Sequence, residues 1–131
     1  MGHDASNDPP VVLLVEDEPL VRMTAADELE EAGFHVLEAA NADVALAVLE
    51  ARSDEVRVLF TDVHMPGSMD GMELAEQVHA RWPHVRILIS SGYARPHQDE
   101  IPDDGRFMPK PYHAETLVRH VHELVGTEEL E

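Results

Sequence analysis

The 131-residue chain is predicted to fold as an α/β domain, a doubly wound sheet of five parallel strands with helices on both faces. Short apolar runs alternate with longer segments of helical periodicity, which is the pattern of successive βαβ units. Several of these runs lead directly into acidic or hydroxyl side chains, as strands do at the edge where open sheets bind ligands. The length suits one domain with its own core.

The first third of the chain predicts two strands and two helices. Residues 11–15 are continuously apolar, and Pro19 suits the first turn of a helix that continues to about residue 32, where Gly33 stops it. Residues 34–38 form the second strand, and Asn41 is the expected N-cap of a helix to residue 52. The residues expected to be buried are Val21, Ala25, Leu29 and Ala32 in the first helix and Val44, Ala45, Val48 and Leu49 in the second.

The middle of the chain predicts a third strand and a third helix. Residues 56–61 are apolar and partly β-branched, and they end at Asp62. After a Pro/Gly-rich loop, Asp70 and Gly71 lead into a helix that Pro83 ends. The apolar face of this helix consists of Leu74, Ala75, Val78 and Trp82.

The last third predicts two strands and one regular helix. Residues 85–90 form the fourth strand, and residues 106–108 form a short fifth. Between them, residues 93–105 contain two prolines and little periodicity, so the fourth helix of the fold is expected to be shortened or irregular. The final helix, residues 113–125, has a clear apolar stripe, which consists of Leu117, Val118, Val121, Leu124 and Val125.

Five such units predict a flavodoxin-like sheet with strand order 2-1-3-4-5 and a crevice between strands 1 and 3. Residues 11–126 are the expected domain, preceded by a flexible leader at 1–10 and followed by an acidic tail at 127–131. No apolar run approaches the roughly 20 residues of a membrane span, and the leader does not resemble a signal peptide. We therefore expect a cytoplasmic domain.

Composition excludes several classes of function. The formal net charge of −18 argues against direct contact with nucleic acid, whose phosphates the chain would repel. The absence of cysteine excludes disulfides, thiolate chemistry and Cys-ligated zinc. The nine histidines lack the tight spacing of a metal site, and solvated or capping roles suit them better.

Polar side chains follow four of the predicted strands and are expected to meet at one edge of the sheet. They are Glu16 and Asp17 after strand 1, Asp62 after strand 3, Ser90 and Ser91 at the end of strand 4, and Lys110 after strand 5. Three carboxylates around one crevice repel one another unless a cation lies among them, and hard oxygen ligands favour Mg²⁺, with Mn²⁺ as the alternative.

The same edge offers the groups that phosphoryl transfer needs. An ammonium and a divalent cation offset the charge on phosphoryl oxygens, while a hydroxyl donates to one of them. Asp62 is the candidate nucleophile, which would form an aspartyl phosphate. Structural interpretations remain beside this one: Asp62 as a capping residue, Glu16 to Glu18 as charge that stabilises a helix N-terminus, and Lys110, the chain's only lysine, as a surface side chain.

Five motifs, in order along the chain, resemble the receiver domain of two-component response regulators. They are Glu16-Asp17, Asp62-Val63-His64-Met65-Pro66, Asp70-Gly71, Ser91-Gly92 and Lys110-Pro111-Tyr112. The resemblance extends over about residues 11–125, so the chain is expected to be a stand-alone receiver or one excised from a larger protein. It also implies a cis peptide bond between Lys110 and Pro111.

The resemblance implies a role for each matching residue. Asp62 would be the phosphoacceptor, Ser91 the switch hydroxyl, Lys110 the ion-pair partner of the phosphoryl group, and Phe107 the aromatic that moves inward on activation. Mg²⁺ would be held by Asp17, by Asp62 and by the main-chain carbonyl of His64, with Glu16 acting through water.

Two features depart from the usual pattern. The loop from Met65 to Gly71 is one residue longer than the common Met-Pro-x-Met-Asp-Gly form, and Phe107 lacks the hydroxyl of a tyrosine. His64 and Tyr93, each two residues after an implied site residue, are bulky, and we hypothesise that they crowd the hydrolytic water and modulate loss of the phosphoryl group.

The implied function is a signalling switch, with no enzymatic activity beyond its own phosphorylation and dephosphorylation. A sensor histidine kinase or phosphotransfer protein would supply the phosphoryl group, and a downstream protein would contact the face around strand 5 and the last helix, with no nucleic acid or membrane partner. We expect a monomer or a weak, phosphorylation-dependent dimer. The alternatives are a small Mg²⁺-dependent phosphohydrolase with an aspartate nucleophile, and a pseudo-receiver that is never phosphorylated.

Overall fold

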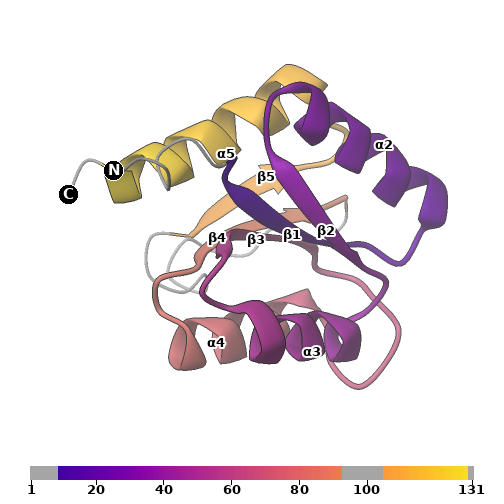
Figure 1. Cartoon of the computed structure of the whole chain (residues 1–131). Helices are drawn as coiled ribbons and strands as arrows, with labels where there is room; N and C mark the ends of the chain where they lie inside the picture. Colours follow the sequence, from indigo (N-terminus) through magenta and orange to yellow (C-terminus); the bar gives the residue numbers. More distant parts are fainter. Residues whose placement is uncertain (1–8, 93–104, 130–131) are drawn as a thin grey trace.

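A computed structural model describes residues 9–92 and 105–129, with side chains described up to Gly126. Five parallel strands form one sheet in the order β2-β1-β3-β4-β5, as predicted (Figure 1). The strands are β1 (Val11–Val15), β2 (His35–Ala39), β3 (Val56–Asp62), β4 (Arg86–Ser91) and β5 (Arg106–Pro109). The described helices are α2 (Pro19–Glu31), α3 (Ala42–Arg52), α4 (Gly71–Arg81) and α5 (Ala114–Glu129).

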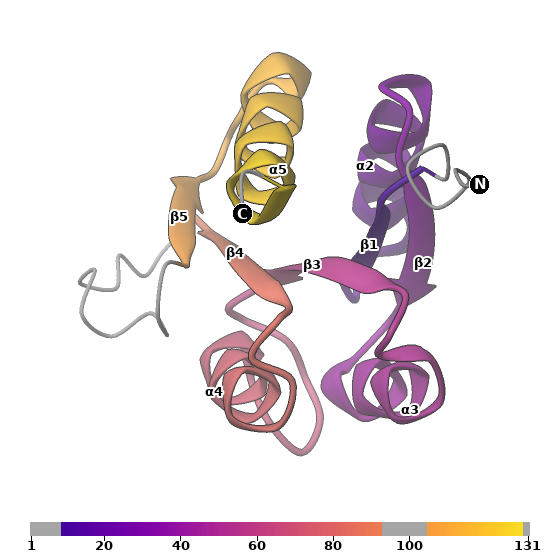
Figure 2. The ribbon, with the colours of Figure 1, turned by 60° about the vertical axis from the view of Figure 1, so that its left-hand side comes forward.

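The helices cover both faces of the sheet. Helices α2 and α5 lie on one face, and α3 and α4 lie on the other (Figure 2). Side chains alternate along each strand, so Ile87 and Ile89 of β4 face α3 and α4, whereas Leu88 faces α2 and α5. This layering is the doubly wound arrangement that the alternation of strands and helices predicts.

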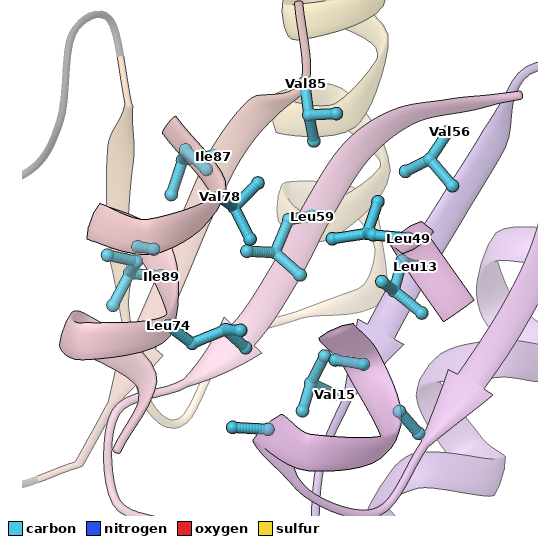
Figure 3. Packing of buried hydrophobic residues seen from close by; sticks show 14 of the residues in the cluster. Leu13, Val15, Leu49, Val56, Leu59, Leu74, Val78, Val85, Ile87 and Ile89 are labelled. Atoms are coloured by element: carbon cyan, nitrogen blue, oxygen red, sulfur yellow. The ribbon is translucent and has the colours of Figure 1, made fainter. Parts of the chain in front are cut away.

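Two apolar clusters, one on each face, hold the layers together. On the α3/α4 face, Leu13 and Leu59 of the central strands pack with Leu49 of α3 and with Leu74 and Val78 of α4 (Figure 3). All five of these side chains are fully buried. The two clusters together bury both faces of the sheet, so the central strands are apolar on both sides.

Most predicted boundaries agree with the structure to within one residue. The expected N-caps are present: Asn41 accepts a hydrogen bond from the Val44 amide at 2.9 Å, and Asp70 caps α4. Helix α5 continues to Glu129, four residues beyond the predicted end, because Gly126 does not interrupt it. The irregular fourth helix predicted within residues 93–105 lies almost entirely outside the described residues.

Two residues predicted to be buried are exposed. Val44 is 42 % exposed and Val21 is 39 % exposed, although both have helical spacing to buried neighbours. Each lies in the first turn of its helix, and helical spacing gives the direction of a side chain but does not ensure that a neighbouring element covers it. Trp82, also predicted to be in the core, is partly buried and packs against the α3/α4-face cluster, while the Arg81 guanidinium lies 4.3 Å from the centre of its ring.

Candidate functional site

The carboxyl ends of the strands bring the predicted polar residues to one edge of the sheet. Asp62 is the last residue of β3, and Ser91 is the last residue of β4. Glu16 and Lys110 each follow directly after a strand, β1 and β5 respectively. Because all the strands are parallel, residues distant in sequence share this edge.

Glu16, Asp17 and Asp62 form an acid cluster. One carboxylate oxygen from each lies within 4.8 Å of the others. Glu16 is buried, and Asp17 and Asp62 are partly buried. A set of hard oxygen donors that converge in this way fits Mg²⁺, so the residues present suit the predicted cation. Among the residues that the structure describes, no other group of three or more acids, histidines or cysteines is arranged to hold a metal ion.

The Lys110 ammonium bridges two members of the acid cluster. Its Nζ lies 3.2 Å from Asp62 Oδ1 and 3.5 Å from Glu16 Oε1. Burial, the largest single influence, lowers the pKa of Lys110, but attraction to Asp62 and Glu16 outweighs it, so the net pKa is raised. Burial also disfavours the charged form of Glu16, and for a carboxyl this raises the pKa, although the Glu18 amide and Lys110 oppose this change. Lys110 is therefore a fixed positive charge beside Asp62.

The loop between β3 and α4 is held by its main chain. The Val63 amide donates to the Ser90 carbonyl at 3.0 Å, and the Gly71 amide donates to the Val63 carbonyl at 2.8 Å. A Cβ atom on Gly71 would lie 2.0 Å from the Asp62 main-chain oxygen. Only glycine permits this approach, which fixes the backbone of Asp62. Sequence reasoning used Gly71 as the start of a helix and as part of the Asp70-Gly71 motif, but it missed this contact.

The additional residue in the same loop is accommodated by a turn. Gly67 has a φ of +117°, a backbone conformation that residues other than glycine rarely adopt. Ser68 Oγ donates to Asp43 Oδ1 at 2.8 Å and so connects the loop to the first turn of α3. The lengthened loop therefore contacts the start of α3.

The two serines at the end of β4 lie in different environments. Strand alternation places Ser91 on the α3/α4 face, where Phe107 is partly buried, and the Lys110 amide donates to the Ser91 carbonyl at 3.0 Å. Ser90 is 1 % exposed on the other face, and its hydroxyl is the one buried side-chain polar atom among the described residues without a hydrogen-bond partner. The switch roles of Ser91 and Phe107 remain predictions.

A cleft of about 810 Å³ opens beside the acid cluster. Its lining includes Asp62, Lys110 and His64, together with the exposed Leu20 and the partly buried Tyr112. The predicted cis peptide bond between Lys110 and Pro111 is present at its rim. Burial raises the pKa of Tyr112 to about 12, with a contribution from Glu28, Glu16 and Asp62. Sequence reasoning assigned no role to Tyr112.

His64 is exposed and lines the cleft, but nothing in the structure tests the predicted use of its main-chain carbonyl. Tyr93, its predicted counterpart after the switch hydroxyl, lies outside the described residues. In the part of the chain that is described, none of the helices has the length and apolar character needed to cross a bilayer.

Comparison with known proteins agrees with this geometry. Residues 12–122 match the family model of the response regulator receiver domain. The chain is 37 % identical over 117 residues to the sensor kinase CckA of Brucella abortus, covering 87 % of this chain and 12 % of that protein. It is 32 % identical over 118 residues to the response regulator receiver protein CpdR of the same organism, covering 87 % of this chain and 95 % of that protein.

Solved structures support the same assignment. The receiver domain of the hybrid histidine kinase CckA superposes with a TM-score of 0.77 at 33 % identity, covering 88 % of this chain and 98 % of that one. A CheY-like receiver domain from Methanospirillum hungatei JF-1 superposes with a TM-score of 0.83 at 25 % identity, covering 92 % and 97 %. The chain belongs to the response regulator receiver domain family of two-component signalling.

Proposed function

We propose that this receiver domain is a phosphoacceptor switch that takes a phosphoryl group onto Asp62 from the phosphohistidine of a partner protein. The observation that carries the proposal is the Lys110 ammonium 3.2 Å from Asp62 Oδ1, within an acid cluster that adjoins an open cleft. A nucleophilic carboxylate with a fixed cation beside it suits attack on a negatively charged phosphoryl group.

The reaction forms one bond and breaks one. A carboxylate oxygen of Asp62 attacks the phosphorus, the bond between phosphorus and the imidazole nitrogen breaks, and the imidazole leaves with the electron pair and takes up a proton. Attack by water on the aspartyl phosphate later releases inorganic phosphate and restores the carboxylate. Lys110 offsets charge on the phosphoryl oxygens in both steps.

The acid cluster would hold Mg²⁺, or Mn²⁺ in its place. When bound, the cation supplies charge neutralisation for the phosphoryl oxygens. Asp17, Asp62 and the main-chain carbonyl of His64 are the proposed ligands, with Glu16 acting through water. The convergence of three carboxylates supports this set, since such a group is costly to bring together without a cation.

Output would follow from movement of Ser91 toward the phosphoryl group and of Phe107 into the space that this movement opens. Ser91 ends β4, and Phe107 of the neighbouring β5 pairs with Ile89, two residues before Ser91 and on the same face of the sheet, which supports a coupled movement. The face around β5 and α5 would then contact a downstream protein, with the domain acting as a monomer or a weak, phosphorylation-dependent dimer.

The phosphoryl donor is a sensor histidine kinase or a phosphotransfer protein, and the working unit is residues 11–126 in the cytoplasm. The likeness to the receiver of a hybrid histidine kinase supports a kinase partner. The cleft beside Asp62 provides the approach to the acceptor, bounded on one side by the exposed Leu20 of α2.

Intact-mass measurement after incubation with acetyl phosphate and Mg²⁺ tests the proposal. We expect one added phosphoryl group on the wild-type chain and none on Asp62→Asn or in the presence of a chelator. Asp70→Asn is the matched control, because it neutralises a nearby acid outside the acid cluster and leaves a side chain that still caps α4. It should be phosphorylated like the wild type.

Two outcomes would contradict the proposal. Phosphorylation of Asp62→Asn would place the acceptor elsewhere, and failure of both phosphorylation and beryllium fluoride binding would favour a pseudo-receiver. Sustained turnover of phosphomonoesters would instead indicate a phosphohydrolase. That activity commonly uses a second acid two residues after the nucleophile, and His64 occupies this position.

A further inference from the structure

The loop that carries Glu16 and Asp17 lacks the usual local means of holding a helix start. Glu18 is the N-cap of α2, but its side chain makes no capping hydrogen bond, and the first turn contains no acid. An uncapped helix start leaves the preceding loop to be held by other groups. In this loop, one such group is the side chain of Arg22, one turn into the helix.

Arg22 connects this loop to the neighbouring strand. Its Nη1 donates to the Glu16 carbonyl at 2.7 Å, and its Nε donates to Glu38 Oε1 on β2 at 3.2 Å. The Arg22 side chain is 20 % exposed, so the pair is partly shielded from solvent. The Glu16 amide donates to the Ala39 carbonyl at 3.0 Å, which ties the same residue to the end of β2 through the main chain.

The contact with the Glu16 carbonyl has a direct consequence for Asp17. A peptide unit is planar, so the Glu16 carbonyl and the amide and Cα of Asp17 move together. Holding that oxygen therefore fixes the point from which the Asp17 side chain extends toward the acid cluster. Lys110 acts differently, because it contacts carboxylate oxygens and offsets their charge.

We propose that Arg22 is a positioning residue for the acid cluster: it fixes the peptide between Glu16 and Asp17 and thereby sets the affinity of the cluster for Mg²⁺. The binding of Mg²⁺ by the acid cluster rests on the function proposed above. Groups that orient metal ligands typically account for a 10–100-fold change in metal affinity when removed.

The sign of the effect separates positioning from simple charge. If Arg22 acted only through its positive charge, Arg22→Ala would strengthen Mg²⁺ binding, because the substitution removes a positive charge that repels the cation. If Arg22 positions the ligands, the same variant weakens binding. Arg22→Lys keeps the charge but has a single nitrogen in place of the planar fork that reaches both Glu16 and Glu38, so it should also weaken binding.

Isothermal titration with Mg²⁺ at a temperature where all variants are folded provides the first measurement. We expect the dissociation constant to rise about tenfold or more for Arg22→Ala, somewhat less for Arg22→Lys and least for Glu38→Gln. Arg81→Ala is the matched control: Arg81 also pairs with a glutamate on a neighbouring element, Glu50 at 3.1 Å, but it lies on the opposite face. An unchanged or lower dissociation constant for Arg22→Ala would overturn the proposal.

Amide hydrogen exchange without metal provides the second measurement. The Glu18 amide donates to Glu16 Oε2 at 3.0 Å, and loss of Arg22 should accelerate exchange at Glu16 and Glu18 relative to the amides of β1. Faster exchange there in a chain that binds no Mg²⁺ would support the positioning role while contradicting the proposed function. Unchanged exchange would contradict the positioning role whatever the metal result.

Discussion

The two loops beside the acid cluster, β1–α2 and β3–α4, differ in the contacts that hold them. In the β1–α2 loop, residues 16–18, the Glu16 amide has a main-chain hydrogen bond to Ala39, and charged side chains supply further contacts: Arg22 holds the Glu16 carbonyl, and Lys110 contacts the Glu16 carboxylate. In the β3–α4 loop, residues 63–70, the contacts are main-chain hydrogen bonds and the close approach of Gly71 to Asp62.

This difference assigns a distinct vulnerability to each loop. Contacts between partly exposed charges weaken with ionic strength and respond to any change of charge nearby. Main-chain hydrogen bonds and close packing are insensitive to salt but tolerate no added volume. The proposed acceptor Asp62 therefore lies on the rigid side of the site, and Glu16 and Asp17 lie on the side whose geometry depends on electrostatics.

Gly71→Ala should produce the largest effect, because it breaks the rigid side. The new Cβ would lie 2.0 Å from the Asp62 oxygen, a main-chain atom that cannot rotate away. Overpacking typically costs 1–3 kcal/mol, and contact with the main chain lies at the upper end, so we expect a loss of about 3 kcal/mol or more in the free energy of unfolding. Urea denaturation measures it.

Gly126→Ala is the control for the same substitution in α5. A Cβ at Gly126 meets nothing within 4 Å, so alanine should stabilise the helix by up to about 1 kcal/mol. Opposite signs for the two variants are the expected result. Equal and small effects would show that the β3–α4 loop moves freely, which would remove the contrast between the loops.

The alkaline titration of Tyr112 should detect the charge of Glu16 in the β1–α2 loop. Its pKa is raised from 10.0 to about 12, chiefly by burial and further by Glu28, Glu16 and Asp62. The unfolded chain therefore loses this proton near pH 10 while the folded chain keeps it. The resulting stability is fully present below pH 10 and is lost as the pH rises toward 12, by about 2 kcal/mol.

Tyr112→Phe should flatten the dependence of stability on pH between 10 and 12, as measured by urea denaturation at each pH. Glu16→Gln should lower the pKa of Tyr112, read from phenolate absorbance in a chain whose other tyrosine, Tyr93, is replaced by phenylalanine. A Tyr112 pKa that Glu16→Gln leaves unchanged would indicate that the charge of Glu16 does not reach Tyr112, and that burial, Glu28 and Asp62 set the pKa.

The sequence predicted the sheet order and the proximity of Asp62 to Lys110, because both follow from the positions of particular residue types along the chain. Apolar periodicity determines the layers, and acids placed after parallel strands must share an edge. The contacts that hold the site were less visible. The acceptor for Arg22 is a main-chain carbonyl, which every residue has, so no sequence pattern marks it.

Apolar periodicity also did not predict which side chains are exposed at the starts of helices. Val44 and Val21 have the spacing of buried residues, but spacing reports the direction of a side chain and not whether a neighbouring element covers it. Leu20, which is 76 % exposed, and Val21 both line the cleft, so exposed apolar residues of α2 adjoin the site.

Asp70→Ala should reduce stability less than Gly71→Ala does and less than the titration of Tyr112 does. It separates the capping hydrogen bond of Asp70 from the effect of its charge. Asp70 accepts from the Glu73 amide at 2.9 Å, and the Glu73 side chain accepts from the Asp70 amide at 3.0 Å, so each satisfies a main-chain donor at the start of α4. We expect a loss of about 1 kcal/mol in urea denaturation, which Asp70→Asn should largely avoid because asparagine caps as well as aspartate does. If Asp70→Asn costs as much as Asp70→Ala, the charge of Asp70 matters and the β3–α4 loop depends on electrostatics after all. If only the alanine variant loses stability, the loop is held by its hydrogen bonds, and the contrast with the charge-dependent β1–α2 loop stands.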